Sequence, residues 1–391
     1  MPTEFISFFV ILLAGLFFSG IFNRLHLPWV AALIIAGIAV GPYAFDIFAP
    51  NPAIEFMGNI GLVFLMFMAG LETRISSFKK DRREIGILVP LSAAIPFSVG
   101  FGIGIYFEYP FLSAIFLGII FISSSIAVII PSLQTNNLFG KRVGKLIMGS
   151  TIITDILSLT LLSILLQTIE PATKIPLPLF YLLLFGSLIL LMRIIPKIVR
   201  YFERHKGRGR RFESELRLIV TILLGTVVIF ELLGLHAIIA GFFAGLVLSE
   251  TITHKVIREK LHTISYGIFI PIFFVLVGVS TNIGIFAEVG NALLITFVVV
   301  IGSVSAKFIS GFIGGRLDGF SKDESALIGV ATTPHLSTTL AAIFIGFKLG
   351  ILDEKLLTAM IILSIITTLI APTIMGKMAK RLDRRAASPT S

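Results

Sequence analysis

The sequence predicts an all-helical membrane protein of about thirteen transmembrane helices, with inverted repeats and two broken helices that cross. Three observations predict this fold class: the composition, a series of long apolar segments, and short motifs that recur in the second half. Hydrophobic residues make up 56% of the 391 residues and charged residues 14%, and the mean hydropathy is +1.00. A soluble domain with a polar surface does not have this composition, so we expect an integral membrane protein.

Apolar runs long enough to cross about 30 Å of hydrocarbon mark the expected helices. They lie at residues 4–22, 29–48, 54–72, 85–107, 111–133, 146–169, 177–195, 216–233, 235–250, 263–281, 288–313, 325–348 and 355–377. Only Gly234 separates two of them, so either that hairpin is tight or one helix begins earlier, and a count of twelve or fourteen stays open. We expect no soluble regulatory domain, because the segments use nearly the whole chain.

Basic residues are concentrated in alternate connections between these segments. They follow segments 3, 5, 7, 9, 11 and 13, within residues 74–83, 141–145, 197–211, 255–260, 316–322 and 377–385. Cytoplasmic loops carry the excess of Lys and Arg, so we expect the N-terminus outside and the C-terminus in the cytoplasm. This pattern also accounts for the net charge of +10, which makes the lipid bilayer, and not nucleic acid, the expected partner.

Two short motifs occur twice. Ile-Ile-Ala-Gly at 34–37 recurs at 238–241, and Gly-Leu-Glu-Thr-Arg-Ile at 70–75 is echoed by Gly-Val-Ser-Thr-Asn-Ile at 278–283. The offsets of 204 and 208 residues nearly agree, and they match segments 2 and 3 with segments 9 and 10. Because seven is an odd number of segments, the two copies must cross the membrane in opposite directions. Inverted repeats are typical of secondary transporters, whose ion sites lie at broken helices near the midplane.

Polar residues and prolines predict breaks at corresponding places in segments 5 and 12. Segment 5 contains Ser-Ser-Ser at 123–125 and then Pro131, and segment 12 contains Thr-Thr-Pro-His at 332–335 and Ser-Thr-Thr at 337–339. Pro334 lacks a backbone donor and disfavours helix at the residue before it. The alternative is a mere kink in which the hydroxyls bond back to their own helix. Matching placement favours two breaks that line a site.

Asp155 is an ionisable residue in the middle of an apolar segment. Such a side chain costs about 2.5 to 3.5 kcal/mol at mid-bilayer, so it rarely persists without a partner or a task. Lys307 is the basic residue farthest from the loops, and it either partners the acid or extends to the cytoplasmic edge, about two turns away. One buried acid and one buried base beside broken helices favour a cation or proton carrier.

Oxygen-bearing residues around Asp155 suit an alkali cation. We expect the ionised carboxylate to bind the cation with help from Thr154, Thr151, Ser124 and Ser125, and Thr151 lies one helical turn before Asp155. A proton and a cation cannot occupy the carboxylate together. Carrying either one across by alternating access therefore gives antiport without ATP, and we expect neither a cofactor nor an enzymatic activity.

Three further residues have two open interpretations each. Glu72 closes segment 3 beside basic residues, which suggests either an interfacial ion pair or a role at the site. Thr333 precedes Pro334 and either contributes to the site or bonds to its own helix. His335 either senses pH or is a hydrogen-bonded structural group beside the break.

Six motifs in a fixed order carry a family resemblance: Leu-Pro at 27–28 followed by Ile-Ala-Gly-Ile-Ala-Val-Gly-Pro at 35–42, Phe-Met-Ala-Gly-Leu-Glu at 67–72, Ser-Ser-Ile-Ala-Val at 124–128, Thr-Asp at 154–155, Glu-Leu-Leu-Gly-Leu at 231–235, and Pro-Ile-Phe-Phe-Val-Leu-Val-Gly at 271–278. With them the whole chain resembles the monovalent cation:proton antiporters, on the branch of Kef-type potassium efflux proteins and bacterial sodium/proton antiporters.

The resemblance implies a sodium/proton antiporter-like fold in the plasma membrane of a prokaryote, with a role in pH homeostasis. It implies an ion-binding core near residues 85–169 and 288–377, a dimerisation scaffold near 1–84 and 177–281, and a homodimer. Asp155 matches the ion-binding aspartate, and Lys307 matches a basic residue of the opposing repeat. The transported ions would be H⁺ and Na⁺, K⁺ or Li⁺.

Two departures from the family pattern leave the choice of cation and the stoichiometry open. Thr154 stands where relatives often have Asp, Asn or Gln, and Ser125 replaces an acid of several sodium-selective relatives. The main alternative is a sodium-coupled symporter of a small organic solute on a related inverted-repeat fold. Such a carrier needs polar groups for an organic anion, whereas this midplane offers little beyond hydroxyls and one acid.

Overall fold

The structure, a computed structural model, describes residues 2–24, 29–47, 50–72, 82–138, 140–169, 177–204, 211–232, 237–249, 251–252, 255–282, 284 and 291–387. Every regular element within these ranges is helical, which confirms the predicted fold class. The predicted hairpin at Gly234 and the basic loop residues 73–81 and 205–210 lie outside the described residues.

The helices are α1 (Pro2–Arg24), α2 (Trp29–Val40), α3 (Pro52–Glu72), α4 (Arg82–Tyr106), α5 (Phe111–Ile122), α6 (Ile126–Thr135), α7 (Arg142–Ile169), α8 (Leu177–Arg204), α9 (Arg211–Leu232), α10 (Ala237–Ser249), α11 (Lys255–Ile264), the π-helix η2 (Ser265–Phe269), α12 (Ile270–Val279), α13 (Asn291–Leu317), α14 (Lys322–Ala331), α15 (Ser337–Lys348) and α16 (Glu354–Ala387). Each predicted segment coincides with one helix or with consecutive helices. Seven helical stretches of the described chain are long and apolar enough to cross a membrane, and α2, α5, α15 and most of α10 are shorter apolar helices.

The predicted end of the second segment is wrong. The second segment was expected to continue to residue 48, but α2 ends at Val40. A turn follows, in which the Ala44 N–H donates to the Gly41 carbonyl at 3.2 Å. The cause is Pro42, which disfavours helix at the residue before it and donates no backbone hydrogen bond.

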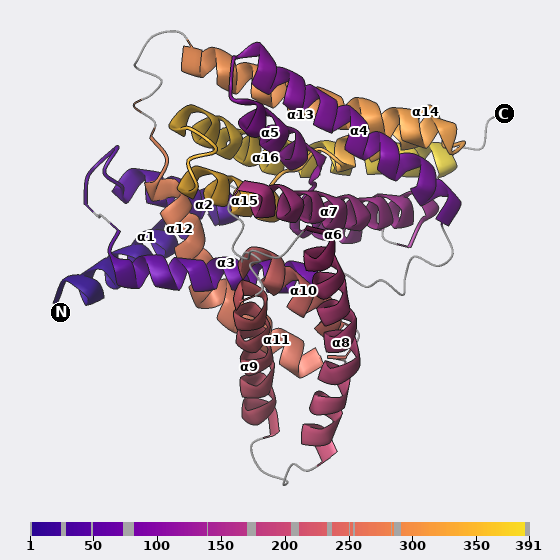
Figure 1. Ribbon diagram of the computed structural model, residues 1–391. Coiled ribbons are helices and arrows are strands. Elements are labelled where there is room, and N and C mark those ends of the chain that lie inside the picture. Colours follow the sequence, from indigo (N-terminus) through magenta and orange to yellow (C-terminus); the bar gives the residue numbers. More distant parts are fainter. Residues whose placement is uncertain are drawn as a thin grey trace. The chain divides into compact units, whose positions relative to one another are not determined.

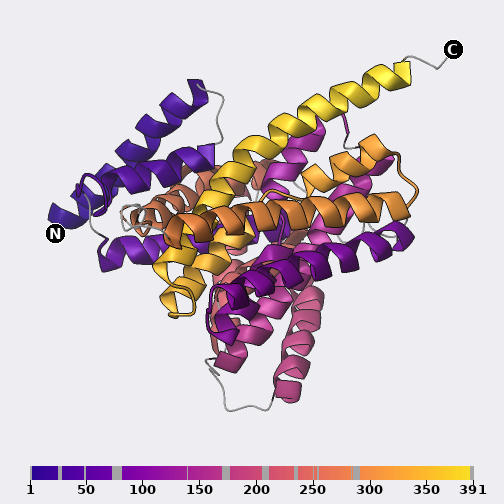
Figure 2. The same ribbon diagram turned by 90° about the horizontal axis from the view of Figure 1, so that it is seen from above.

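The chain divides into two compact units. The first contains residues 1–12, 50–75 and 163–276, and the second contains residues 13–49, 76–162 and 277–391. In the first unit α3 packs along α10, α9 packs against α10 and α11, and α8 lies beside α9 (Figure 1). In the second unit α13 packs against α4, α14 and α16, and α4 packs against α5 (Figure 2).

The two motifs predicted as repeats form very close helix contacts. Gly70 of α3 and Gly245 of α10 each lie against the other helix's backbone, so close that an added Cβ would come within 2.1 Å of a carbonyl oxygen. In the second unit Gly278 of α12 lies equally close to the Ile34 carbonyl of α2. Each copy of one motif therefore packs against a copy of the other, through the small residues that membrane helices use for close approach.

A further repeat becomes visible in the second unit. Gly118 of α5 lies against the Phe97 backbone of α4, and Gly329 of α14 lies in the same way against the Phe308 backbone of α13. Two more contacts match in the same way. The contact of Gly100 with Gly118 corresponds to that of Gly311 with Gly329, and the contact of Gly104 with Ala114 corresponds to that of Gly315 with Ser325. All are offset by 211 residues, as are the starts of α6 and α15. The α4–α5–α6 and α13–α14–α15 units are thus structural copies.

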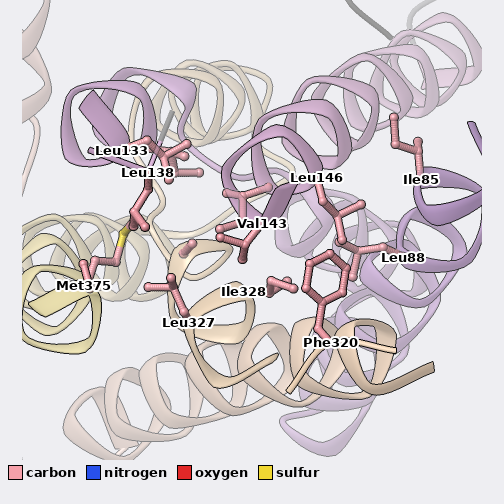
Figure 3. Close-up of a cluster of buried hydrophobic side chains, with 14 residues drawn as sticks. Ile85, Leu88, Leu133, Leu138, Val143, Leu146, Phe320, Leu327, Ile328 and Met375 are labelled. Carbon is pink, nitrogen blue, oxygen red and sulfur yellow. The ribbon is translucent and has the colours of Figure 1, made fainter. Parts of the chain in front are cut away.

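The two ends of the second unit differ in character. At one end α4, α6, α7, α14 and α16 enclose a cluster of buried hydrophobic side chains that includes Leu88, Leu133, Leu146 and Met375 (Figure 3). Phe320 belongs to it and carries the Arg142 guanidinium 4.3 Å above its ring. At the other end the start of α5 and the loop before it meet the loop before α16: Ser113 Oγ donates to the Ile351 carbonyl at 2.6 Å, and Tyr109 Oη donates to Asp353.

Candidate functional site

Two helix breaks form the centre of the second unit, as predicted. Residues 123–125 between α5 and α6 are outside helix, and Ser123 (φ −63°, ψ 149°) and Ser125 (φ −83°, ψ 106°) have extended backbone. Residues 333–336 between α14 and α15 are also outside helix, and Leu336 has φ −150° and ψ −95°. Non-helical backbone at membrane depth is tolerated only where protein or a wet cavity satisfies its polar groups.

The two breaks are joined by hydrogen bonds. The Ser125 backbone N–H donates to the Pro334 carbonyl at 2.7 Å, and Ser124 Oγ donates to the Thr332 carbonyl at 2.9 Å. Because Pro334 interrupts the helix, its carbonyl is available to the opposite break. Each break therefore satisfies backbone groups of the other, and moving one must disturb its partner.

The carboxylate of Asp155 lies where both breaks can reach it. Asp155 comes from α7 and is 1% exposed. Its Oδ1 accepts from Ser123 Oγ at 2.7 Å and from the Ser124 N–H at 3.4 Å, and its Oδ2 accepts from Thr338 Oγ1 at 3.1 Å. The donors lie just before α6 and in the first turn of α15, where the helix dipole favours negative charge. The site thus combines three donors with two helix N-termini.

Lys307 lies on the opposite side of the first break. Its side chain comes from α13, is fully buried, and donates through Nζ to the Ile122 carbonyl and to Ser124 Oγ, the latter at 2.8 Å. Ile122 is the last residue of α5, so the ammonium lies at a helix C-terminus, where positive charge is favoured. Lys307 does not extend to the membrane edge. It forms no direct ion pair with Asp155, and Ser124 links the two charges.

The predicted oxygen ligands differ in their availability. Ser125 Oγ and Thr151 Oγ1 are buried and have no hydrogen-bond partner among the described residues. Ser124 Oγ is engaged by Lys307 and by the Thr332 carbonyl. Thr154 Oγ1 bonds back to its own helix, at 3.0 Å from the carbonyls of Ser150 and Thr151. Two of the four predicted hydroxyls therefore have no partner among the described residues. Ser125 follows Ser124, whose N–H donates to the carboxylate, and Thr151 lies one helical turn before Asp155.

The three residues with two open interpretations are not among the hydrogen-bond donors to the carboxylate. Glu72 ends α3 and belongs to the first unit, whereas Asp155 belongs to the second. Thr333 Oγ1 donates to the Val330 carbonyl of its own helix at 2.8 Å. His335 is fully buried, with Nε2 at 2.9 Å from Ser303 Oγ and Nδ1 at 3.1 Å from Thr339 Oγ1.

Sequence reasoning missed two residues that touch the carboxylate, Ser123 and Thr338. Both were recognised as members of the hydroxyl-rich breaks, but nothing ranked them above their neighbours. The signal lies in the fold: Ser123 ends α5 beside α7, and Thr338 falls in the first turn of α15. Only the crossing of the breaks decides which hydroxyls point to Asp155.

This arrangement is suited to an ion without directional preference. It offers one carboxylate and uncommitted hydroxyl oxygens, and no thiolate can contribute, since the chain has no Cys. Hard cations prefer such oxygen ligands. A carboxylate also binds a proton, so the same oxygens offer a site to either ion.

Comparison with known proteins gives a consistent result. Residues 8–381 match the family model described as sodium/hydrogen exchanger, transmembrane. The chain is 30% identical over 381 residues to the probable Na⁺/H⁺ antiporter 3 of Methanocaldococcus jannaschii, covering 96% of both chains. It is 28% identical over 376 residues to the Na⁺/H⁺-K⁺ antiporter GerN of Bacillus cereus, covering 94% of this chain and 95% of the relative. Among solved structures, the sodium proton antiporter MjNhaP1 of Methanocaldococcus jannaschii at pH 8 matches with a TM-score of 0.69 at 19% identity, over 95% of this chain and 96% of that one.

Proposed function

Because this chain belongs to the sodium/hydrogen exchanger family, we propose that it exchanges Na⁺ or K⁺ for protons across the membrane, with both ions competing for Asp155. The observation that carries this proposal is the buried carboxylate at the crossing of the two breaks, held by hydroxyls from both of them. The family assignment supports an antiporter and gives no support to the sodium-coupled symporter.

Competition follows from the chemistry of the carboxylate. The ionised form accepts hydrogen bonds from Ser123, Ser124 and Thr338, and these donors stabilise negative charge away from water. A proton on either oxygen removes the charge that attracts a cation. A bound cation in turn opposes protonation, so each ion leaves before the other binds.

We propose that the cation is coordinated by Asp155 together with Ser125 Oγ and Thr151 Oγ1. A hydroxyl carries two acceptor lone pairs besides its single donor, and these two hydroxyls have no partner among the described residues. Ser123 and Thr338 add two more oxygens if their hydroxyls rotate away from the carboxylate. Thr154 and Ser124 act indirectly, the first through its helix and the second by linking Lys307 to the site.

The relatives' names differ in the cation that they give. The names of the relatives include Na⁺ for the Methanocaldococcus protein and both Na⁺ and K⁺ for GerN. The site holds one acid and otherwise neutral oxygens, which accept Na⁺, K⁺ or Li⁺ without a strong intrinsic preference. We propose Na⁺ or K⁺ as the physiological ion and expect Li⁺ to substitute.

Alternating access requires the site to move against a scaffold. We propose that residues 85–169 and 288–377 form the moving core and that residues 1–84 and 177–281 form the scaffold and the surface of a homodimer. The placement of residues 76–162 and 277–391 in one compact unit supports the core. Residues 13–49 belong to that unit too, so the scaffold's share of the N-terminal helices is the part of this proposal to test first.

The test uses purified protein in liposomes that contain a pH-sensitive dye. An imposed proton gradient is followed by addition of Na⁺, K⁺, Li⁺ or choline, for wild type and for Asp155→Asn. We expect alkali cations to drive proton movement in the wild type and not in the variant. Asp353→Asn, at a loop acid away from the breaks, is the matched control and retains activity. Absence of cation-driven proton movement in well-folded wild type would overturn the proposal.

A further inference from the structure

His335 is buried in the second break, and the exchange mechanism assigns it no task. Its ring bridges two helices: Nε2 is 2.9 Å from Ser303 Oγ on α13, and Nδ1 is 3.1 Å from Thr339 Oγ1 on α15. A neutral imidazole has one donor and one acceptor nitrogen, and a hydroxyl satisfies either role. Both ring nitrogens are therefore paired, although the structure does not distinguish the tautomers.

The backbone of His335 is held as well. Its N–H donates to Thr367 Oγ1 of α16 at 3.1 Å, and its carbonyl accepts from Thr368 Oγ1 at 3.5 Å. The peptide groups of a helix break have lost their intrahelical partners, and these two threonines replace them. One residue thus fastens the break to α13, α15 and α16.

The repeat of α4–α5–α6 in α13–α14–α15 shows which residue of the first break corresponds to His335. At the offset of 211 residues, His335 is the counterpart of Ser124 in the first break. Ser124 is tied to α13 by Lys307, and His335 is tied to α13 by Ser303, which is one helical turn from Lys307. Helix α13 therefore anchors both breaks, the first through a charged side chain and the second through a neutral pair.

We propose that His335 is a positioning residue that sets the cation affinity of the site by fixing the second break. Two contacts transmit the effect. The carbonyl of Pro334, the residue before His335, accepts from the Ser125 N–H, and the hydroxyl of Thr338, three residues after His335, donates to Asp155. Loss of the His335 hydrogen bonds to Ser303 and Thr339 would displace both contacts. The inference rests on the proposed exchange function, because cation affinity is its main readout.

Positioning matters more for a cation than for a proton. A proton needs a single carboxylate oxygen, whereas an alkali cation needs several oxygens placed together around it. A loosened second break separates Thr338 and Ser125 from Asp155 and leaves the carboxylate itself intact. Loss of His335 should therefore raise the cation concentration needed for half-maximal exchange and change the maximal rate much less.

Two substitutions separate the possible roles. His335→Gln keeps a donor and an acceptor on a side chain of similar reach but cannot take up a proton, and His335→Leu keeps the volume without either bond. We expect His335→Leu to raise the half-saturating Na⁺ concentration roughly tenfold, about the value of one buried hydrogen bond. His335→Gln should stay within about twofold of wild type on the same scale. His262→Leu, at a histidine of the first unit that stacks on Tyr266, is the matched control and leaves this concentration unchanged.

Hydrogen–deuterium exchange supplies a readout that does not depend on transport. In His335→Leu we expect faster amide exchange in peptides covering 332–340 and 122–128, and wild-type protection in His335→Gln. Unchanged cation affinity together with unchanged amide protection in His335→Leu would overturn the proposal. A His335→Gln variant as inactive as Asp155→Asn would also overturn it, because that result would make His335 a proton carrier. If the wild type moves no protons in response to cations but His335→Leu loses protection, the exchange function falls and the anchoring of the break stands.

Discussion

Asp155 persists in an apolar helix because its neighbours share the cost of its charge. Hydroxyls of Ser123 and Thr338 and one backbone N–H donate to its oxygens, and the N-terminal ends of two half-helices face it. Lys307 stabilises the opposite polarity at the end of α5. The negative carboxylate therefore lies at helix N-termini and the positive ammonium at a helix C-terminus.

The two uncommitted hydroxyls give the residue-scale prediction. Ser125→Ala and Thr151→Val each remove one proposed cation oxygen without breaking an existing hydrogen bond among the described residues. We expect each to raise the half-saturating cation concentration roughly three- to tenfold, and the double variant to raise it further. The measurement is the cation dependence of proton movement in liposomes. Ser265→Ala is the control, since it removes an equally buried, unpartnered hydroxyl of the first unit; equal effects in all three would argue against a ligand role.

The sequence identified the charges of this site more readily than its hydroxyls. Asp155 and Lys307 stand out because an ionisable residue is rare and costly in an apolar segment. Hydroxyls are common in broken membrane helices, and whether one bonds its own backbone depends on its rotamer. Thr154 bonds back in this way, and Thr338 turns to Asp155. The helix positions alone do not separate these two outcomes.

Helix ends and breaks were predictable where proline and hydroxyl residues coincide. Both breaks were anticipated, because Pro334 and the serines at 123–125 disfavour continued helix. The early end of α2 was missed, although Pro42 provided the same signal. The glycine contacts that match α4 and α5 with α13 and α14 were missed, since they are made by scattered residues that form no contiguous motif.

A pair of glycines on α4 tests these helix contacts. A Cβ on Gly104 would come within 2.6 Å of the Ala114 Cα, whereas a Cβ on Gly102 meets nothing within 4 Å. We expect Gly104→Ala to lower stability by about 1–3 kcal/mol through overpacking. Gly102→Ala should be neutral or slightly stabilising, because Ala favours helix. Unfolding temperatures in detergent provide the comparison, and equal behaviour of the two variants would contradict the packing described for α4 and α5.

On the scale of the whole molecule, the two ends of the second unit agree with the charge pattern. The hydrophobic cluster at one end adjoins Arg142 and the C-terminal part of α16, which are basic, while the loops before α5 and α16 meet at the other end. Loops predicted to lie on the same side of the membrane are thus found at the same end of the second unit. The orientation itself remains a prediction from the distribution of Lys and Arg.

The absence of cysteine makes the orientation directly measurable. Lys355 precedes the main part of α16 and Lys322 begins α14, and both are exposed. With the N-terminus outside, a membrane-impermeant maleimide should label Lys355→Cys in intact cells and Lys322→Cys only after the membrane is opened. The reverse pattern would invert the topology, and the cysteine-free parent provides the background.

Competition between the two ions for Asp155 is the central claim, and transport kinetics at several pH values test it most directly. Initial rates of exchange are measured in liposomes over a range of Na⁺ or K⁺ concentrations, with the same pH on both sides of the membrane. The account predicts that lowering the pH raises the half-saturating cation concentration, by up to about tenfold per pH unit, and leaves the extrapolated maximal rate nearly unchanged. A maximal rate that falls while half-saturation stays constant would place the proton and the cation at separate sites and contradict the account.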